Sequence, residues 1–205
     1  MKVLLVNGSP HKNGCTNRAL EEVQKQLDKE GIESEIFWIG AEVQGCIGCF
    51  SCMETGKCVF DDILSDFVAK AEAADAFVFG SAVYYGSSTG SVSSFMDRLF
   101  FSAGKVMQHK PAASVVSCRR GGASMAFSQM NMYYMMSNMP VISSQYWNQV
   151  HGMSPDEVEQ DAEGLQTMRT LGSNMAWLLK LIELGRKNGL ERPELEIPVS
   201  TNFIH

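Results

Sequence analysis

The stretch that decides the fold is Lys2-Val3-Leu4-Leu5-Val6-Asn7-Gly8-Ser9-Pro10-His11-Lys12-Asn13-Gly14-Cys15-Thr16-Asn17. It opens with four strongly apolar residues in succession, which is the pattern of a central parallel strand that helices cover on both faces. A glycine-containing loop follows and leads directly into a helical pattern from Thr16 to Glu30, which stops at Gly31. A strand, a loop and a helix in this order predict the first unit of an alternating α/β fold.

The loop between this strand and this helix has the composition of an anion site. Its backbone N–H groups and the hydroxyls of Ser9 and Thr16 can surround a phosphate, and a helix N-terminus adds partial positive charge. The loop lacks the Gly-Lys-Ser/Thr ending of triphosphate loops and the Gly-x-Gly-x-x-Gly spacing of dinucleotide folds. The alternative, for the loop taken alone, is a tight turn with an ordinary helix cap.

Strand-like and helical segments alternate along the rest of the chain. Besides residues 2–7, short apolar runs predict strands at Glu35–Ile39, Ala76–Ser81, Ala112–Ser117 and Val141–Tyr146. The later helical patterns are Asp61–Ala74, Ser91–Ala103, Ala123–Asn138 and a last region from about Pro155 to Lys187 with a break expected near Gly164 or Gly172. The alternation predicts a doubly wound, five-stranded parallel sheet with right-handed crossovers and helices on both faces.

Composition favours a single domain over residues 1–205, with a C-terminal helical extension from about residue 153. The formal net charge of −6 gives no cationic surface to neutralise phosphates, so nucleic acid is not an expected partner. The apolar run after Lys2 is too short for the core of a signal peptide, and no stretch approaches the ~18–20 apolar residues of a membrane span. We therefore expect a cytoplasmic protein without membrane contact.

The segment Ser124–Met136 is rich in methionine and apolar around most of its circumference. One face of a sheet cannot cover a helix of this kind. It is either a deeply buried helix or, because methionines adapt to irregular surfaces, a subunit interface or a wall of a ligand site. A monomeric mass in solution would exclude the interface.

The segment after the third predicted strand is expected at the same crevice as the phosphate loop. In an open parallel sheet, ligands lie beyond the carboxyl ends of strands where the winding reverses, and for the flavodoxin strand order 2-1-3-4-5 this place is between strands one and three. There the chain carries Ser81-Ala82-Val83-Tyr84-Tyr85-Gly86-Ser87-Ser88. The two adjacent tyrosines can offer flat apolar surface and hydroxyl groups to a ring system.

Together and in this order, the segments resemble the NAD(P)H-dependent FMN reductase and iron-sulfur flavoprotein branch of the flavodoxin-like superfamily. The resemblance covers most of the first 150 residues and includes Phe95-Met96-Asp97-Arg98 and the loop Ser117-Cys118-Arg119-Arg120-Gly121-Gly122. It implies that the first loop holds the FMN phosphate, that Ser81–Gly86 lines the flavin ring and ribityl chain, and that the loop 117–122 completes the flavin edge. The FMN contacts that it implies are Ser9, His11, Asn13, Cys15, Thr16, Asn17, Ala82, Val83, Tyr84, Tyr85, Gly86, Ser117, Arg119, Gly121 and Gly122.

The resemblance is incomplete in the first loop. His11 stands where arginine is common in the family, and Cys15 stands where asparagine is common. These differences concern individual phosphate contacts rather than the whole site. Of the two arginines, we expect Arg119 to favour a reduced, anionic flavin and Arg98 to be a structural partner of Asp97.

Four of the six cysteines form the pattern Cys46-x2-Cys49-x2-Cys52-x5-Cys58 in a glycine-rich loop. Six cysteines in 205 residues are too few for a disulfide scaffold, and the spacing of these four is typical of metal or redox chemistry in a reducing compartment. Four thiolates are the ligand set of an iron-sulfur cluster, here a compact 4Fe-4S cubane, whereas structural zinc commonly uses two separated knuckles. The pattern resembles that of iron-sulfur flavoproteins, but flavin reductases of the same family keep similar cysteines as free thiols or a disulfide, so both alternatives stay open.

The resemblance implies an FMN-dependent oxidoreductase that transfers electrons from NAD(P)H through the flavin to a small acceptor, such as a quinone, a nitroaromatic compound or free flavin. No catalytic side chain is expected, because the flavin performs the chemistry. The alternatives are an iron-sulfur flavoprotein with a redox protein as partner and a flavodoxin-like electron carrier. A phospho-acceptor signalling domain would need carboxylates where this chain has Asn7 and Ser81. The resemblance also implies a homodimer or homotetramer.

Overall fold

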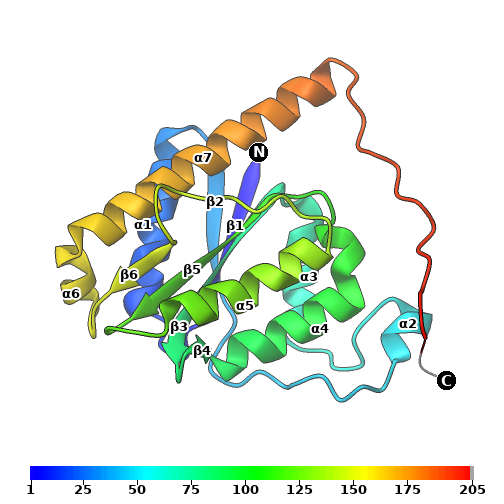
Figure 1. The fold of residues 1–205 in the computed structure, drawn as a ribbon, viewed down its shortest axis with the longest axis horizontal. Coiled ribbons are helices and arrows are strands. Elements are labelled where there is room, and N and C mark those ends of the chain that lie inside the picture. The colour runs from blue at the N-terminus through cyan, green and yellow to red at the C-terminus, as the bar shows by residue number, and fades with distance from the viewer. Residues whose placement is uncertain (204–205) are drawn as a thin grey trace.

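The computed structural model describes residues 1–203, and helices and strands alternate in it as the sequence predicts (Figure 1). The strands are β1 (Lys2–Asn7), β2 (Glu33–Trp38), β3 (Ala76–Tyr84), β4 (Ser87–Ser88), β5 (Ala112–Cys118) and β6 (Gln149–His151). The helices are α1 (Cys15–Lys29), α2 (Ser51–Thr55), α3 (Ile63–Ala73), α4 (Gly90–Met107), α5 (Ala123–Met136), α6 (Pro155–Gln160) and α7 (Ala162–Lys187). Within residues 1–203, none of the helices combines the length and the apolar content that a membrane crossing requires.

The main sheet has its parallel strands in the order β2-β1-β3-β5-β6, and the two-residue β4 pairs antiparallel with the end of β3. Apart from that addition, the predicted order 2-1-3-4-5 is confirmed. In the centre, Val6 of β1 lies opposite Phe37 on one side and Phe79 on the other. The winding therefore reverses between β1 and β3, which is where this kind of sheet opens a crevice.

Helices cover both faces of the sheet (Figure 1). Side chains of α3, α4 and α5 form one core with Leu4 and Val6 of β1, and side chains of α1, α6 and α7 form the other core with Val3 and Leu5. Successive residues of a strand point to opposite faces. Both faces of β1 are therefore buried, and this burial explains the continuous apolar run with which the sequence begins.

The predicted strand Val141–Tyr146 is wrong. This segment makes one isolated bridge, between Val141 and Ala112. The chain then turns, because the Ser144 hydroxyl bonds to the carbonyl of Tyr146 and the side chain of Asn148. Such local hydroxyl contacts compete with a strand ladder, and the strand beside the end of β5 forms three residues after this segment, as β6.

The C-terminal helical region breaks at Asp161, three residues before Gly164, so the break lies near the first of the two expected positions and not near Gly172. The Asp161 carboxylate accepts a hydrogen bond from the Gly164 N–H at 2.9 Å and caps the start of α7. Gly172 lies inside α7 at its contact with α1, where an added Cβ would lie 2.8 Å from the Cβ of Gln26. This glycine therefore allows two helices to pack closely, and it does not end one of them.

The methionine-rich helix α5 is not deeply buried, so that alternative is wrong. Ala126, Met130 and Tyr134 pack in the core, while the other side of the helix is open to solvent. We call this open side the methionine face; its members, which are 63–92% exposed, are Met125, Met132, Met135 and Met136. Only one side of α5 therefore packs against the sheet.

Candidate functional site

A cleft lies at the carboxyl ends of β1, β3 and β5, beside the place where the winding reverses. About 970 Å³ of space lies between its walls, in part continuous with solvent. The residues that line it are Ser9, His11, Gly14, Cys15, Thr16, Ala82, Val83, Tyr84, Ser117, Cys118, Arg119, Gly152, Met153, Ser154 and Pro155. The loop after β1, the end of β3 and the loop after β5 therefore meet at one cleft, although they are far apart in the sequence.

The loop after β1 is held in shape by the buried side chain of Asn7. Its Oδ1 accepts a hydrogen bond from the Ser9 N–H at 3.0 Å, and its Nδ2 donates to the Lys12 carbonyl at 2.8 Å and to Oδ1 of Asn17 at 3.3 Å. The Ser9 hydroxyl accepts in turn from the His11 N–H at 3.2 Å. One side chain thus spans the loop and directs its backbone around the cleft.

Two glycines let this loop pass between β3 and α4. The Gly8 N–H donates to the Gly80 carbonyl at 2.9 Å, and the Thr89 hydroxyl donates to the Gly8 carbonyl at 2.8 Å. An added Cβ on Gly8 would lie 1.8 Å from Cγ2 of Val92, and one on Gly80 would lie 2.8 Å from Cγ2 of Thr16. A larger residue at Gly8 would force the loop and α4 apart, and a larger residue at Gly80 would push α1 away from the sheet.

The N-terminus of α1 opens on the cleft without a side-chain cap. Gly14 is the N-cap residue, no side chain accepts a hydrogen bond there, and the first turn holds no acidic residue. Beside it, the hydroxyls of Thr16 and Ser117 lie 2.8 Å apart and share a hydrogen bond. Backbone N–H groups of a first helical turn together with hydroxyls are a donor set that suits a phosphate.

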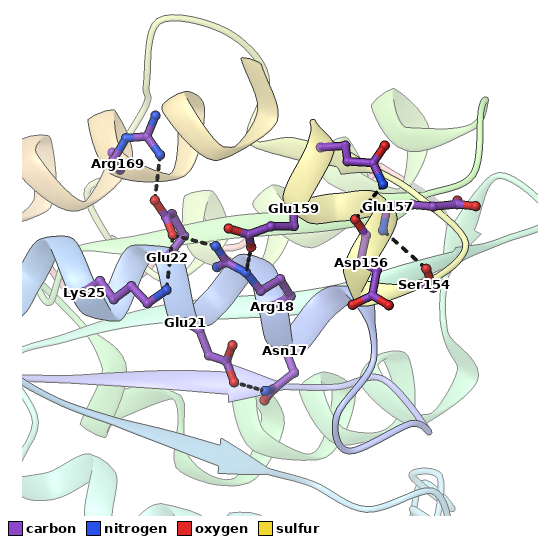
Figure 2. A network of polar contacts seen from close by, with 11 residues as sticks. Asn17, Arg18, Glu21, Glu22, Lys25, Ser154, Asp156, Glu157, Glu159 and Arg169 are labelled. Carbon is purple, nitrogen blue, oxygen red and sulfur yellow. Dashed lines mark hydrogen bonds and ion pairs between the residues drawn. The ribbon is translucent and has the colours of Figure 1, made fainter. Parts of the chain in front are cut away.

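A network of ion pairs ties α6 to α1 and α7 next to the cleft (Figure 2). Arg18 of α1 pairs with Glu159 of α6 and with Glu22, which also accepts from Arg169 of α7 at 2.6 Å. Burial raises the pKa of Glu22, but the hydrogen bonds from Arg169 and Arg18 outweigh burial and leave the pKa below its ordinary value. The network holds the segment before α6, Gly152–Pro155, against the rest of the cleft.

Two thiols lie in the walls of the cleft. Cys15 follows the N-cap of α1, and its Sγ donates to the Gly152 carbonyl at 3.5 Å. Burial raises the pKa of the Cys15 thiol, and it also raises the pKa of the Cys118 thiol. Both groups are therefore poor nucleophiles at neutral pH.

A second hollow lies on the loop that carries the four clustered cysteines. It is lined by Cys46, Ile47, Cys49, Phe50, Cys52, Cys58, Val59, Phe60, Arg98, Phe101 and Ser102, and all six cysteines of the chain are free. In the part of the chain that the structure describes, no three His, Cys, Asp or Glu side chains are grouped around the position of a single metal ion. All four clustered cysteines line this hollow, and four thiolates are the ligand set of an iron-sulfur cluster, in which each iron binds its own thiolate.

The sequence model of a known family, the NADPH-dependent FMN reductases, matches residues 1–153. This chain belongs to that family. An iron-sulfur flavoprotein of Methanocaldococcus jannaschii is 31% identical to it over 192 residues, which cover 89% of this chain and 100% of the relative. The family is one of flavoprotein oxidoreductases, and relatives of this chain within it are named iron-sulfur flavoproteins.

Solved structures show that this FMN reductase family member has a flavodoxin-like fold. RosB, determined with bound 8-demethyl-8-formylriboflavin-5'-phosphate, superposes with a TM-score of 0.71 at 14% identity and covers 100% of this chain and 94% of its own. A flavodoxin from the domain Archaea superposes with a TM-score of 0.61 at 16% identity and covers 88% of this chain and 99% of its own. At these identities the likeness concerns the fold alone.

Most of the FMN contacts expected for this family line the cleft. The predicted residues that line it are Ser9, His11, Cys15, Thr16, Ala82, Val83, Tyr84, Ser117 and Arg119. The predicted residues that do not line it are Asn13, Asn17, Tyr85, Gly86, Gly121 and Gly122. Among the second group, the Tyr85 side chain is fully exposed, and Gly122 packs so close to Gly86 that an added Cβ would lie 2.9 Å from its Cα.

Sequence reasoning missed the wall formed by Gly152–Pro155 and the role of Asn7. Ser154 caps α6 by accepting from the Glu157 N–H, and Pro155 is the first residue of that helix. A serine followed by a proline, with a glutamate three positions after the serine, is a helix-start signal. It predicts where α6 begins, but it does not predict that the start of α6 faces the cleft of this FMN reductase family member.

The expected pairing of Arg98 with Asp97 is wrong. Asp97 accepts a hydrogen bond from the Tyr133 hydroxyl, and Arg98 forms a bidentate ion pair with Asp62, with N–O distances of 2.7 and 2.8 Å. Residues adjacent in a helix point in different directions. Arg98 therefore faces the cysteine loop and not the flavin cleft of the family.

Proposed function

We propose that this chain is an FMN-dependent oxidoreductase that takes electrons from NAD(P)H and passes them to a small acceptor, such as a quinone, a nitroaromatic compound or free flavin. The observation that carries the proposal is the cleft at the switch point of the sheet, where an uncapped helix N-terminus faces the ends of β3 and β5. Membership of the NADPH-dependent FMN reductase family supports the same function.

Three of the walls of the cleft have a part in this proposal: the loop after β1 with the start of α1, the end of β3, and the loop after β5. The hydroxyls of Ser9 and Thr16 and the first-turn N–H groups of α1 hold the FMN phosphate. Val83 and Tyr84 give apolar surface to the flavin ring, and Arg119 supplies a permanent positive charge that favours the reduced, anionic flavin. Bound FMN supplies hydride acceptance and electron release, so the protein binds, orients and shields.

Anaerobic purification and visible spectroscopy test this proposal. We expect a yellow protein with two flavin bands that bleach when NADPH or NADH is added. A colourless protein that takes up no added FMN contradicts the flavin site. Flavin that stays oxidised with both nucleotides but is reduced by dithionite contradicts the nicotinamide step and leaves a flavodoxin-like carrier.

A paired substitution tests the phosphate end of the cleft. Thr16→Val keeps the side-chain shape but removes the hydroxyl that meets Ser117, so we expect the dissociation constant of FMN to rise about tenfold, as for the loss of one hydrogen bond to a charged group. Thr170→Val in α7 makes the same chemical change outside the cleft and should leave that constant unchanged. If the two variants had equal dissociation constants for FMN, the proposal that the FMN phosphate lies beside Thr16 would be contradicted.

The cysteine loop supports a second function for the same chain. We propose that Cys46, Cys49, Cys52 and Cys58 bind a 4Fe-4S cluster that exchanges electrons with a redox protein. All four cysteines line one apolar hollow, Cys46 and Cys49 are exposed, and full-length relatives are named iron-sulfur flavoproteins. The hollow and the flavin cleft have no lining residue in common.

Metal and sulfide analysis tests the cluster. We expect the anaerobically purified protein, or the protein reconstituted with iron and sulfide, to contain about four irons per chain, as four-thiolate cubane ligation requires. A protein that holds zinc, or that holds no iron after reconstitution, contradicts the cluster. The flavin proposal does not depend on this result, since the two hollows are separate.

A further inference from the structure

Arg98 of α4 is 1% exposed, and its side chain enters the cysteine loop. A guanidinium has five N–H groups, and five acceptors surround this one. Nε donates to Sγ of Cys58 at 3.3 Å; Nη1 donates to Oδ2 of Asp62 at 2.7 Å and to the Gln44 carbonyl at 3.1 Å; Nη2 donates to Oδ1 of Asp62 at 2.8 Å and to the Phe60 carbonyl at 3.4 Å. The group is therefore fully partnered, which is what a buried charge requires.

The acceptors lie on both sides of the cluster of cysteines in the sequence. Gln44 precedes Cys46, the first cysteine, whereas Phe60 and Asp62 follow Cys58, the last. The guanidinium also lies 5.1 Å from the centre of the Phe60 ring, in cation–π contact. One arginine from α4 thus joins the two ends of the cysteine loop and fixes them to the sheet domain.

Cys58 is placed differently from the other three clustered thiols. Its sulfur accepts the Nε–H of Arg98, while the Asp62 carboxylate pairs with the opposite edge of the guanidinium. Among residues 1–203, the other three cysteines of the loop show no hydrogen bond to an arginine or lysine side chain. A positive group therefore faces one sulfur of the four.

We propose that Arg98 is a positioning residue for the iron-sulfur cluster, which fixes Cys58 as a ligand and raises the reduction potential of the cluster. The inference rests on the proposed ligation of a cluster by the four cysteines. Hydrogen bonds to ligand sulfurs and nearby charge set the potentials of such clusters. Reduction adds negative charge to the cluster and its thiolates, and a buried guanidinium at one sulfur stabilises that added charge.

Redox titration of the reconstituted full-length protein, followed by electron paramagnetic resonance of the reduced cluster, tests the inference. Arg98→Met removes the charge and the five donors, and we expect the ratio of reduced to oxidised cluster at a fixed potential to fall at least tenfold, which is about 59 mV for one electron. Arg98→Lys keeps the charge and should give a smaller fall. Asp62→Asn removes the negative partner, keeps an oxygen for the cap of α3, and should shift the ratio the other way.

Arg18→Met is the matched control, because Arg18 is another buried, ion-paired arginine but lies in α1, away from the cysteine loop. It should lower the stability of the protein and leave the cluster potential unchanged. If Arg98→Met keeps its FMN but loses iron, the reduction potential of the cluster is measured in Arg98→Lys and Asp62→Asn instead. The inference is overturned if every variant of Arg98 and Asp62 that holds a cluster has the same cluster potential as the wild-type protein.

The failure of the cluster proposal looks different from the failure of this inference. Wild-type protein that holds no iron after reconstitution overturns both. A wild-type cluster whose potential is unaffected by every change at Arg98 and Asp62 overturns only the role of Arg98. A fall for Arg98→Met, a smaller fall for Arg98→Lys and a rise for Asp62→Asn are the set of results that supports it.

Discussion

Arg119 and Arg120 are neighbours in the chain and both are exposed, but only Arg119 lines the cleft. We expect Arg119→Gln to weaken FMN binding and to slow flavin reduction by NADPH about tenfold or more, because a charge-assisted contact contributes about 1.5–3 kcal/mol. Equilibrium titration and stopped-flow absorbance measure the two effects.

Arg120→Gln is the control for this prediction, since it removes the same charge one residue away. Its effects should stay within about twofold, as expected of an exposed charge in water. Equal losses in the two variants would show that the general charge of the loop matters, and would contradict a specific place for Arg119 beside the flavin.

Single residues also show what the sequence could not predict. The place of Ser9, Thr16 and Arg119 in the lining of the cleft was predictable, because their motifs follow the strands of the sheet in a fixed order. The partner of Arg98 was not predictable, since Asp62 lies 36 positions away and reaches it only through the packing of α3 against α4. Neighbours in sequence are poor guides to ion pairs within a helix.

Among the elements, the junction of β1 with α1 depends on Gly8. We expect Gly8→Ala to lower the free energy of unfolding by about 1–3 kcal/mol, because its Cβ would overlap Cγ2 of Val92 and force a shift of the loop or α4. Urea denaturation measures the loss, and the double variant Gly8→Ala/Val92→Ala should recover a part of it.

Gly90→Ala is the matched control, since an added Cβ there meets no atom within 4 Å. Gly90 begins α4, so alanine should leave the free energy of unfolding unchanged or raise it by up to about 1 kcal/mol. A loss for Gly90→Ala as large as that for Gly8→Ala would contradict the close packing of the loop as the cause.

The contact of α1 with α6 and α7 is sensitive to acid through Glu22. Its pKa is lowered in the folded protein, so Glu22 contributes stability above its unfolded pKa of about 4.3, and this contribution is lost as the pH falls through the folded pKa. We expect Glu22→Gln to cost about 3 kcal/mol at pH 7, as for a broken buried ion pair. The difference between wild type and variant should shrink as the pH falls below about 4.

Urea denaturation at several pH values measures this effect. Glu183→Gln, which breaks the surface pairs with Arg186 and Lys187, should change the free energy of unfolding by less than about 1 kcal/mol at any pH. If the cost of Glu22→Gln were independent of pH, the ionised form of Glu22 would not be the source of the stability.

The elements that the sequence predicted well are those with long, regular burial. β1 and β3 are buried on both faces, and α1 has one apolar stripe, so their patterns are plain. β6 has three residues with one of them, Val150, buried, which is too short for a pattern. The break at Asp161 was also hidden, because this carboxylate accepts from the His151 N–H of β6 as well as capping α7.

At the scale of the whole molecule, we expect the methionine face of α5 to bind a second copy of this chain. The sheet covers only one side of the helix, none of the described residues of α5 lines the cleft, and methionine packs well at irregular contacts. We expect light scattering to give twice or four times the mass of one chain. The double variant Met132→Glu/Met135→Glu should lower that mass.

Leu184→Glu is the control, because Leu184 is an exposed leucine of α7, which packs on the opposite face of the sheet. It should leave the mass unchanged. A monomeric wild-type protein would contradict an interface at α5 and would leave the methionine face without the role proposed here.

The position of the cleft was predictable from the sequence because it follows from strand order alone. Parallel strands in the order β2-β1-β3-β5-β6 bring the ends of β1 and β3 together, so the loops after them must meet. The wall formed by Gly152–Pro155 was not predictable in this way. Its position depends on the packing of α6 against α1, where Arg18 pairs with Glu159, a residue more than a hundred positions away in the chain. No local pattern contains such a contact.

The direction in which β1 runs has a practical consequence for attaching the protein to an electrode. Met1 precedes the strand at the amino edge of the sheet, and a strand of six residues separates it by about 20 Å from the edge where the cleft opens. A tether on Met1 would therefore fix the protein with its cleft turned toward the solution. Current through such a film would depend on a dissolved mediator that reaches the cleft, and direct exchange with the surface would be slow.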